Sequence, residues 1–319
     1  MDGFIGHHPA AGTPVDEDDS LAGRGGSRAW RTLRRDPAAW VGGGLASAIV
    51  ALTILAPVIA PHDPLHQYRE LMPLDGSLLP PGGQFLLGTD NLGRDYLSRL
   101  LHAGRATLLV GLGANLIAIA VGTLVGLVAA YSGTPTVGFR GRKVGIPVEG
   151  SLMRVTDIGL AFPALLLAIA LTAVFHPSLE IVAIVIAVVL WAGTARLVYA
   201  RTLVLRESDF VLAAVAVGSR PPRIVRRHLL PHLLPLIVVI GAAGIAVTVL
   251  FEATLSFLGA GAPVDTPTWG RMLAETRSYY QTDLRLPLLP GLAIFFTVFA
   301  FTLLGDALSD ALDPHAWQR

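Results

Sequence analysis

The sequence contains no cysteine and only one lysine, Lys143, among its 319 residues. Without cysteine the chain can form neither a disulfide nor a thiolate metal site. The phosphate-binding loop GxxxxGK[ST] is also excluded, because Lys143 is followed by Val144. We therefore expect any ATP chemistry to belong to another chain.

Charge is scarce as well. Charged residues make up 15% of the chain, whereas a soluble domain carries about 25%. The net charge of +1 gives no reason to expect a nucleic-acid partner. HExxH, GxSxG and GxGxxG motifs do not occur, so we expect no catalytic or metal site in this chain.

Apolar residues account for 53% of the sequence and gather into long runs bounded by charges or turn residues. Crossing about 30 Å of hydrocarbon takes roughly 20 residues. The runs predict an all-α polytopic membrane protein with six spans. These are expected near residues 40–60, 105–131, 155–175, 180–200, 231–257 and 288–308.

The spans divide the chain into regions. Residues 1–35 are expected to form a disordered cytoplasmic tail, because the segment is mostly polar and small and has no apolar period. Residues 36–319 are expected to form the membrane domain. In that domain an outer segment at 61–104 precedes the core spans at 105–308.

Arginine and lysine are concentrated on one side of the predicted membrane. The loop at 196–230 carries seven arginines, whereas the loop at 176–180 has no Lys or Arg and the one at 258–287 has three arginines balanced by three acids. Positively charged loops stay in the cytoplasm. This asymmetry predicts a plasma-membrane protein with both termini in the cytoplasm.

The segment between the fourth and fifth predicted spans has the signals of a short helix. Ser208 is a suitable N-cap, and Asp209 lies in the first turn, where the helix dipole favours an acid. Gly218 can end the helix in a left-handed conformation, and Pro221 prevents its continuation.

This short helix is apolar on all sides, which requires cover from several directions. Phe210, Ala213, Ala214 and Val217 follow a helical stripe, and Leu212 lies on another face. The helix either packs under the chain's own spans or seats in a groove of a cytosolic partner. The predicted docking residues are Phe210, Leu212, Ala213, Ala214, Val217, Gly218, Ser219 and Arg220.

Arg223, Arg226 and Arg227 follow in the same loop. They can face the partner too, or they can meet anionic lipid headgroups as anchors on the inner side of the membrane.

Glu252 lies within the fifth predicted span, where an ionisable side chain normally faces protein or water. It is interpreted either as a structural carboxyl bonded to a neighbouring helix or as part of the translocation path.

Outside the membrane, Asp90, Arg94, Asp95 and Arg99 recur at about one helical turn and are expected to pair along a surface helix. Asp90, Arg94 and Asp95, together with Trp269, are expected to form an outer mouth that contacts a binding protein, although Trp269 can equally be an interfacial anchor.

Several stretches of the sequence carry a specific resemblance. Ala213-Ala214, Gly218 and the run 227–231 are similar to the cytoplasmic loop of binding-protein-dependent ABC importer permeases. The runs 56–64, 87–99, 153–163, 252–259, 267–270 and 304–314 resemble the C-type permease subunit of dipeptide and oligopeptide importers. The likeness covers about residues 30–315. It departs at Leu212, where the family has glutamate, and at Val215, where the family has a basic residue.

The resemblance implies a type I ABC importer fold in which residues 210–220 form the coupling helix. It implies a second permease subunit, two cytosolic ATP-binding subunits that hold ATP and Mg²⁺, and an extracytoplasmic substrate-binding protein. It implies no cofactor in this chain. Nickel chelates and haem are alternatives to peptides as cargo. An ion-coupled secondary transporter is the alternative of a different class, but the sequence shows no clear internal repeat of the kind those proteins often have.

Overall fold

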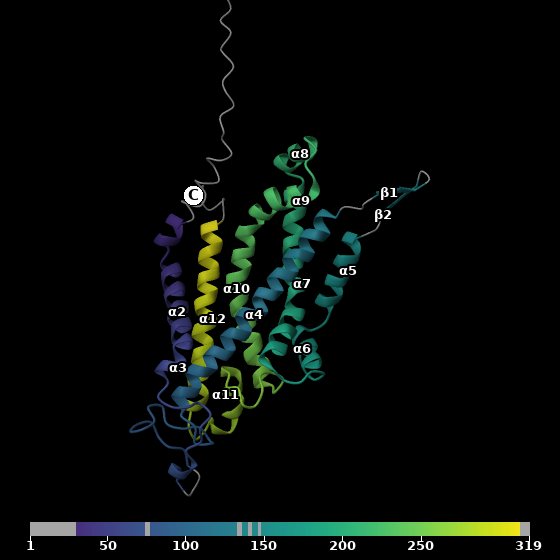
Figure 1. Cartoon of the computed structure of the whole chain (residues 1–319). Coiled ribbons are helices and arrows are strands. Elements are labelled where there is room, and N and C mark those ends of the chain that lie inside the picture. The colour runs from purple at the N-terminus through teal and green to yellow at the C-terminus, as the bar shows by residue number, and fades with distance from the viewer. Residues whose placement is uncertain (1–29, 74–76, 133–135, 140–141, 146–147, 313–319) are drawn as a thin grey trace, which may run out of the picture.

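The computed structural model describes residues 30–73, 77–132, 136–139, 142–145 and 148–312. Within these residues, five helices are long and apolar enough to cross a membrane. They are α2 (Pro37–Ile54), α4 (Tyr96–Tyr131), α7 (Leu179–Arg206), α10 (Leu230–Phe257) and α12 (Arg285–Leu312). α2, α12, α10 and α7 run side by side along the long direction of the molecule, and α4 crosses the bundle obliquely (Figure 1).

The third predicted span, 155–175, is not a straight helix. α5 (Val148–Ala161) and α6 (Ala164–Thr172) meet at an angle of 88°. Pro163 explains the break, because it lacks the N–H that would continue the helix and disfavours helical geometry at Phe162. If this bent pair is counted as one span, the described part of the chain has six.

Other boundaries also differ from the prediction. α4 begins at Tyr96, inside the segment 61–104 that was expected to precede the core spans. Residues 30–35, assigned to the disordered tail, are helical; the rest of that tail lies outside the described residues. A hairpin of β1 (Thr136–Phe139) and β2 (Arg142–Gly145) is added to the helical architecture.

The short elements lie at the two ends of the bundle. α8 (Asp209–Ala216), α9 (Pro221–Ile224) and the hairpin lie at the end where α2 begins and α12 finishes, and α3 (Ala56–Ile59) and α11 (Trp269–Glu275) lie at the opposite end (Figure 1). We call these the inner and the outer end. The connection from α9 to α10 is a π-helical turn, η2 (Val225–Leu229), and two 3-10 turns are η1 (Arg69–Leu71) and η3 (Arg277–Tyr279).

Small residues let α4 and α7 approach closely. A Cβ added at Gly122 would lie 2.6 Å from the Cβ of Thr194, and one added at Gly126 would lie 2.6 Å from the carbonyl oxygen of Ala195. The GxxxG pair therefore packs against a helix of the same chain, as such motifs do where backbones must come close.

Candidate docking helix and outer-loop cluster

The short helix α8 ends as its sequence predicts. Gly218 has φ of 78°, in the left-handed region. Its N–H donates to the carbonyl oxygen of Val215 (2.9 Å), and the Ser219 N–H donates to that of Ala214 (3.0 Å). This pair of bonds is a Schellman motif, which satisfies carbonyls at the helix end. At the start of α8 the Ser208 hydroxyl donates to the Leu205 carbonyl and does not cap the helix.

One face of α8 packs against the chain's own helices. Val211, 1% exposed, and Ala214 lie in a cluster with Leu205 of α7 and Leu233 of α10. Phe210 packs beside them and stacks on His232, with ring centroids 4.6 Å apart. The helix is therefore fixed to the inner ends of both α7 and α10.

The other face of α8 is apolar and exposed. Leu212 and Val215 are 53% and 54% exposed, and Val217 beyond the last turn is 82% exposed. Ala213 is exposed beside them. Contiguous apolar surface outside the membrane is typical of a protein–protein contact. We call Leu212, Ala213, Val215 and Val217 the docking face.

The structure thus splits the predicted docking residues between two environments. Phe210 and Ala214 belong to the inner packing and do not form the docking face. Gly218 and Arg220 are exposed and Ser219 is half-buried at the end of the helix. The predicted set omits Val215, although its apolar side chain on a helix predicted to be cytoplasmic is the signal that could have identified it.

The acidic and basic residues of the outer segment do not lie on a surface helix. Asp90 and Arg99 are each 1% exposed, and Arg94 and Asp95 are also buried. Asp90 precedes α4 and lies in a turn, where its carboxylate accepts bonds from the backbone N–H groups of Leu92 and Arg94. The expected pairing along an exposed helix is therefore wrong.

These charges form a buried network that joins two outer loops. The Asp90 carboxylate pairs with Arg94 (2.7 Å) and with Arg99. Arg94 and Arg99 also reach Glu275 of α11, at 3.1 Å and 2.9 Å, and Arg271 pairs with Glu275 at 3.3 Å. We call these five residues the outer-loop cluster. Glu275 was missed because two of its partners, Arg94 and Arg99, lie more than 170 positions away in the sequence.

Asp95 and Trp269 have structural roles close to the cluster. The Asp95 carboxylate caps α4 by accepting the Ser98 N–H (3.1 Å). Trp269 is buried, and its indole N–H donates to the Leu100 carbonyl (3.0 Å). The four residues expected to contact a binding protein are all buried here, so none presents an outer surface in this structure.

Glu252 is fully buried at the outer end of α10. Its Oε1 accepts a bond from the Ser256 hydroxyl (2.6 Å), and the Thr107 and Thr268 hydroxyls lie close to the carboxyl group. Nearby, a Cβ on Gly270 would lie 2.2 Å from the Ala253 carbonyl oxygen, so the first turn of α11 packs tightly on α10. This geometry favours the interpretation of Glu252 as a structural carboxyl between α10, α4 and the start of α11.

The arrangement defines a multi-pass helical membrane protein whose short helix α8 lies at the inner end of the bundle. Its fold is similar to that of chains in two structures titled as inward-facing conformations of the MetNI methionine ABC transporter. One has a TM-score of 0.52 and 20% identity and covers 67% of this chain and 96% of that one. The second has a TM-score of 0.54 and 18% identity, with 68% and 97% covered.

The sequence comparisons identify the family. Residues 122–318 match the binding-protein-dependent transport system inner membrane component, and residues 26–81 match the N-terminal TM domain of oligopeptide transport permease C. The chain belongs to this family of ABC importer permeases.

Named relatives support this assignment over most of the chain. A dipeptide transport system permease protein DppC of Alkalihalophilus pseudofirmus is 35% identical over 96% of this chain and 95% of its own. The di/tripeptide permease DppC of Pseudomonas aeruginosa is 38% identical, with 89% and 90% covered. The glutathione permease GsiD of Escherichia coli is 38% identical, with 89% of each chain covered.

Proposed function

We propose that the chain is the membrane-spanning subunit of an ATP-driven importer of short peptides, with α8 docked on a cytosolic ATPase subunit. The observation that carries this proposal is the docking face. It exposes apolar side chains beyond the inner end of the bundle, while the opposite face of the same helix is anchored to the spans. A partner that covers the exposed face would therefore be mechanically connected to the membrane helices.

The anchoring suggests how movement of a partner would reach the spans. Val211 and Ala214 tie α8 to α7 and α10, so displacement of α8 would displace the inner ends of both. Between α9 and α10 the chain forms η2, where the Leu230 N–H bonds to the Val225 carbonyl five residues back. Pro231 lacks an N–H, which explains why regular helical bonding is interrupted here. Such π-helical turns recur at functional sites, and η2 would let the inner end of α10 adjust as α8 moves.

The proposed orientation places the inner end in the cytoplasm. The two described ends of the chain lie at this end with α8 (Figure 1), as an even number of crossings requires. Arg220, Arg223, Arg226 and Arg227 are exposed there, in agreement with the positive-inside rule.

In the proposed assembly a second permease completes the pathway, two ATPase subunits hold ATP and Mg²⁺, and an extracytoplasmic binding protein delivers cargo. ATP-driven closure of the ATPases would open the bundle outward, as an alternating-access cycle in which the partner biases one of two states.

Short peptides are proposed as cargo because the relatives named above transport dipeptides, tripeptides or glutathione. Uptake of a labelled dipeptide and tripeptide by cells with and without this chain tests the assignment. Nickel-chelate and haem uptake measured in the same strains would reveal the alternative cargoes. Loss of one of those, with peptide uptake unchanged, would contradict the peptide proposal.

Val215→Glu tests docking. It places a carboxylate on the docking face, where burial of an unpaired charge is costly. We expect cargo-stimulated ATPase activity of the assembled complex to fall at least tenfold, which corresponds to about 1.4 kcal/mol. Val215→Leu keeps the surface apolar, so the stimulated ATPase activity of this variant should stay within about twofold of the wild-type value.

Ala214→Glu is a poorer test, because Ala214 is buried in the chain's own packing. If Val215→Glu assembles and couples like Val215→Leu, the docking assignment is wrong.

A further inference from the structure

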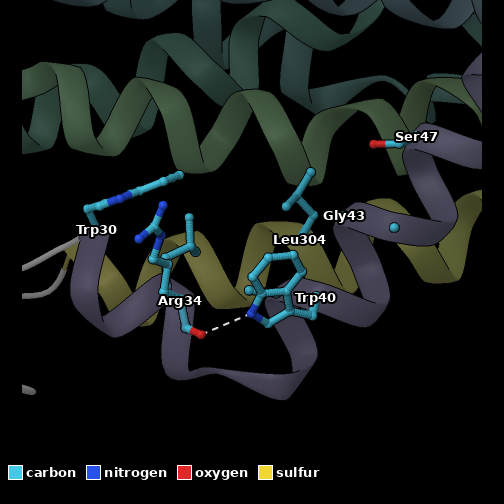
Figure 2. A pocket seen from close by; sticks show the side chains of 9 residues that line it. Trp30, Arg34, Trp40, Gly43, Ser47 and Leu304 are labelled. Carbon is cyan, nitrogen blue, oxygen red and sulfur yellow. Dashed lines mark hydrogen bonds between the residues drawn. The ribbon is translucent and has the colours of Figure 1, made fainter.

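A cavity of about 440 Å³ opens at the inner end of α2, away from the docking face. Figure 2 shows it in the bend between helical residues 30–35 and α2, with Leu304 of α12 at its base. We call it the elbow cavity. Its lining residues are Trp30, Leu33, Arg34, Ala39, Trp40, Gly43, Gly44, Ser47 and Leu304.

Two glycines keep the elbow cavity open. A Cβ added at Gly44 would meet no atom within 4 Å, and one at Gly43 would meet only Leu304, at 3.9 Å. Gly42 differs, because its added Cβ would lie 2.9 Å from Leu303 on α12. One glycine therefore brings the two helices together, and the next two leave a hollow beside the contact.

The mouth of the cavity is built from two tryptophans and an arginine. The Arg34 guanidinium lies over the Trp30 ring, 4.9 Å from its centroid. The Trp40 indole N–H donates to the Arg34 carbonyl oxygen at 2.9 Å, which ties residues 30–35 to α2 (Figure 2). Trp30 and Trp40 are nevertheless 55% and 67% exposed. Tryptophan with one apolar and one polar side is enriched where a membrane meets water.

The charge around the mouth is positive. Arg34 and Arg35 are exposed, and the described residues that line the cavity include no carboxylate. The adjacent Asp36 is engaged as the N-cap of α2, accepting the Ala38 N–H at 2.9 Å. A ligand with a negatively charged head would meet the Arg34 guanidinium group, and its apolar part would lie against Leu304 and the two glycines.

The cavity also lies on a helix that is open to its surroundings. α2 is at the edge of the bundle, with three of its 18 residues buried, and the cavity lies at the inner end of this apolar helix, which is long enough to cross a membrane. The volume is within the range of about 300–1,000 Å³ that is typical of ligand pockets. We propose that the elbow cavity binds one anionic phospholipid, with its phosphate at Arg34 and an acyl chain along Gly43, Gly44 and Leu304.

The test is the lipid retained by the assembled transporter from nanodiscs of phosphatidylglycerol and phosphatidylcholine, measured by native mass spectrometry. The wild type should retain phosphatidylglycerol in preference to phosphatidylcholine. Arg34→Gln should lower this preference about fivefold, the effect of one arginine near a membrane surface. Arg201→Gln, which removes an exposed arginine elsewhere at the inner end, should leave it unchanged.

A second variant tests the cavity without altering charge. Gly44→Leu fills the hollow and should abolish retention of the bound lipid, whereas Gly113→Leu adds the same side chain to open space on α4 and should not. Equal retention of the two lipids by the wild type, or no effect of Arg34→Gln, would overturn the proposal. Two other results would also overturn the proposal. One is lipid retention that the full chain lacks and that is seen only after removal of residues 1–29. The other is lipid retention by the isolated subunit but not by the assembled transporter.

Discussion

The docking face exposes apolar side chains, whereas the outer-loop cluster buries charged ones. On α8, Leu212, Val215 and Val217 are exposed, whereas in the cluster Asp90 and Arg99 are buried. The cluster is self-sufficient, because each of its charges meets opposite charges within the chain. The described residues of this chain do not cover the docking face. The outer loops are therefore held together internally, whereas the docking face would be covered only in the proposed assembly.

The two regions also differ in the free-energy cost of a substitution. Exposed apolar surface lacks the favourable free energy of burial, and a partner that covers the surface restores it. A buried charge that loses its partner has a much larger penalty, because water cannot replace the lost interaction. Substitutions in the cluster should therefore affect folding most, and substitutions on the docking face should affect function most.

The largest effect on stability is expected from Asp90→Asn, which leaves Arg94 and Arg99 with less compensating charge inside the protein. Breaking a buried pair costs about 3–5 kcal/mol, so we expect unfolding in detergent micelles to become easier by about 3 kcal/mol. Denaturant titration of the purified chain measures this value.

The matched control for Asp90→Asn is Asp157→Asn, which removes the exposed pair between Asp157 and Arg196 (2.8 Å). Exposed pairs contribute about 0–1 kcal/mol, so this variant should be close to wild type. Equal destabilisation by the two variants would refute the contrast between a buried network and a surface pair.

An intermediate effect is expected within α8 itself. Val211→Ala removes two buried methyl groups and should cost about 2 kcal/mol of stability. Leu212→Ala, on the exposed face, should cost about 0.5 kcal/mol or less but should weaken coupling to the ATPase. Measuring unfolding and ATPase stimulation for both variants checks the two faces independently. Similar stability losses at the two positions would show that the docking face is covered by the chain itself.

The smallest effect is expected at Gly218. Its positive φ makes alanine unfavourable by about 1 kcal/mol, and an added Cβ would touch no other atom. Gly113→Ala adds a Cβ to open space inside a helix and should raise stability by about 0.5 kcal/mol. Equal unfolding curves for the two variants would argue against a conformational role for Gly218.

Much of the architecture could be predicted from the sequence, because long apolar runs and proline or glycine punctuation act locally. The spans that became α7, α10 and α12 were located to within a few residues at most ends. The third span was predicted as continuous, although Pro163 was a visible reason for the bend. Residues 30–35 were assigned to the tail because a helix of six residues has too little pattern to detect.

The candidate sites were predicted less completely, because they depend on distant contacts. The spacing of Asp90, Arg94 and Asp95 suggested a surface helix, since local periodicity cannot reveal that Glu275 neutralises the arginines. Similarly, the all-round apolarity of α8 left two interpretations open. The chain's own packing accounts for one face of the helix, and docking on a partner is proposed for the other.

By itself the sequence determined that this is a polytopic helical membrane protein of an importer family, and that it contains no GxxxxGK[ST] phosphate-binding loop. Hydrophobic length, charge asymmetry and local motifs carry that information directly. Only the tertiary structure decided which face of α8 is left exposed, that the outer charges are buried together, and that residues 30–35 and α2 enclose a cavity. Those outcomes depend on which distant segments meet, and packing between helices sets this rather than any local pattern.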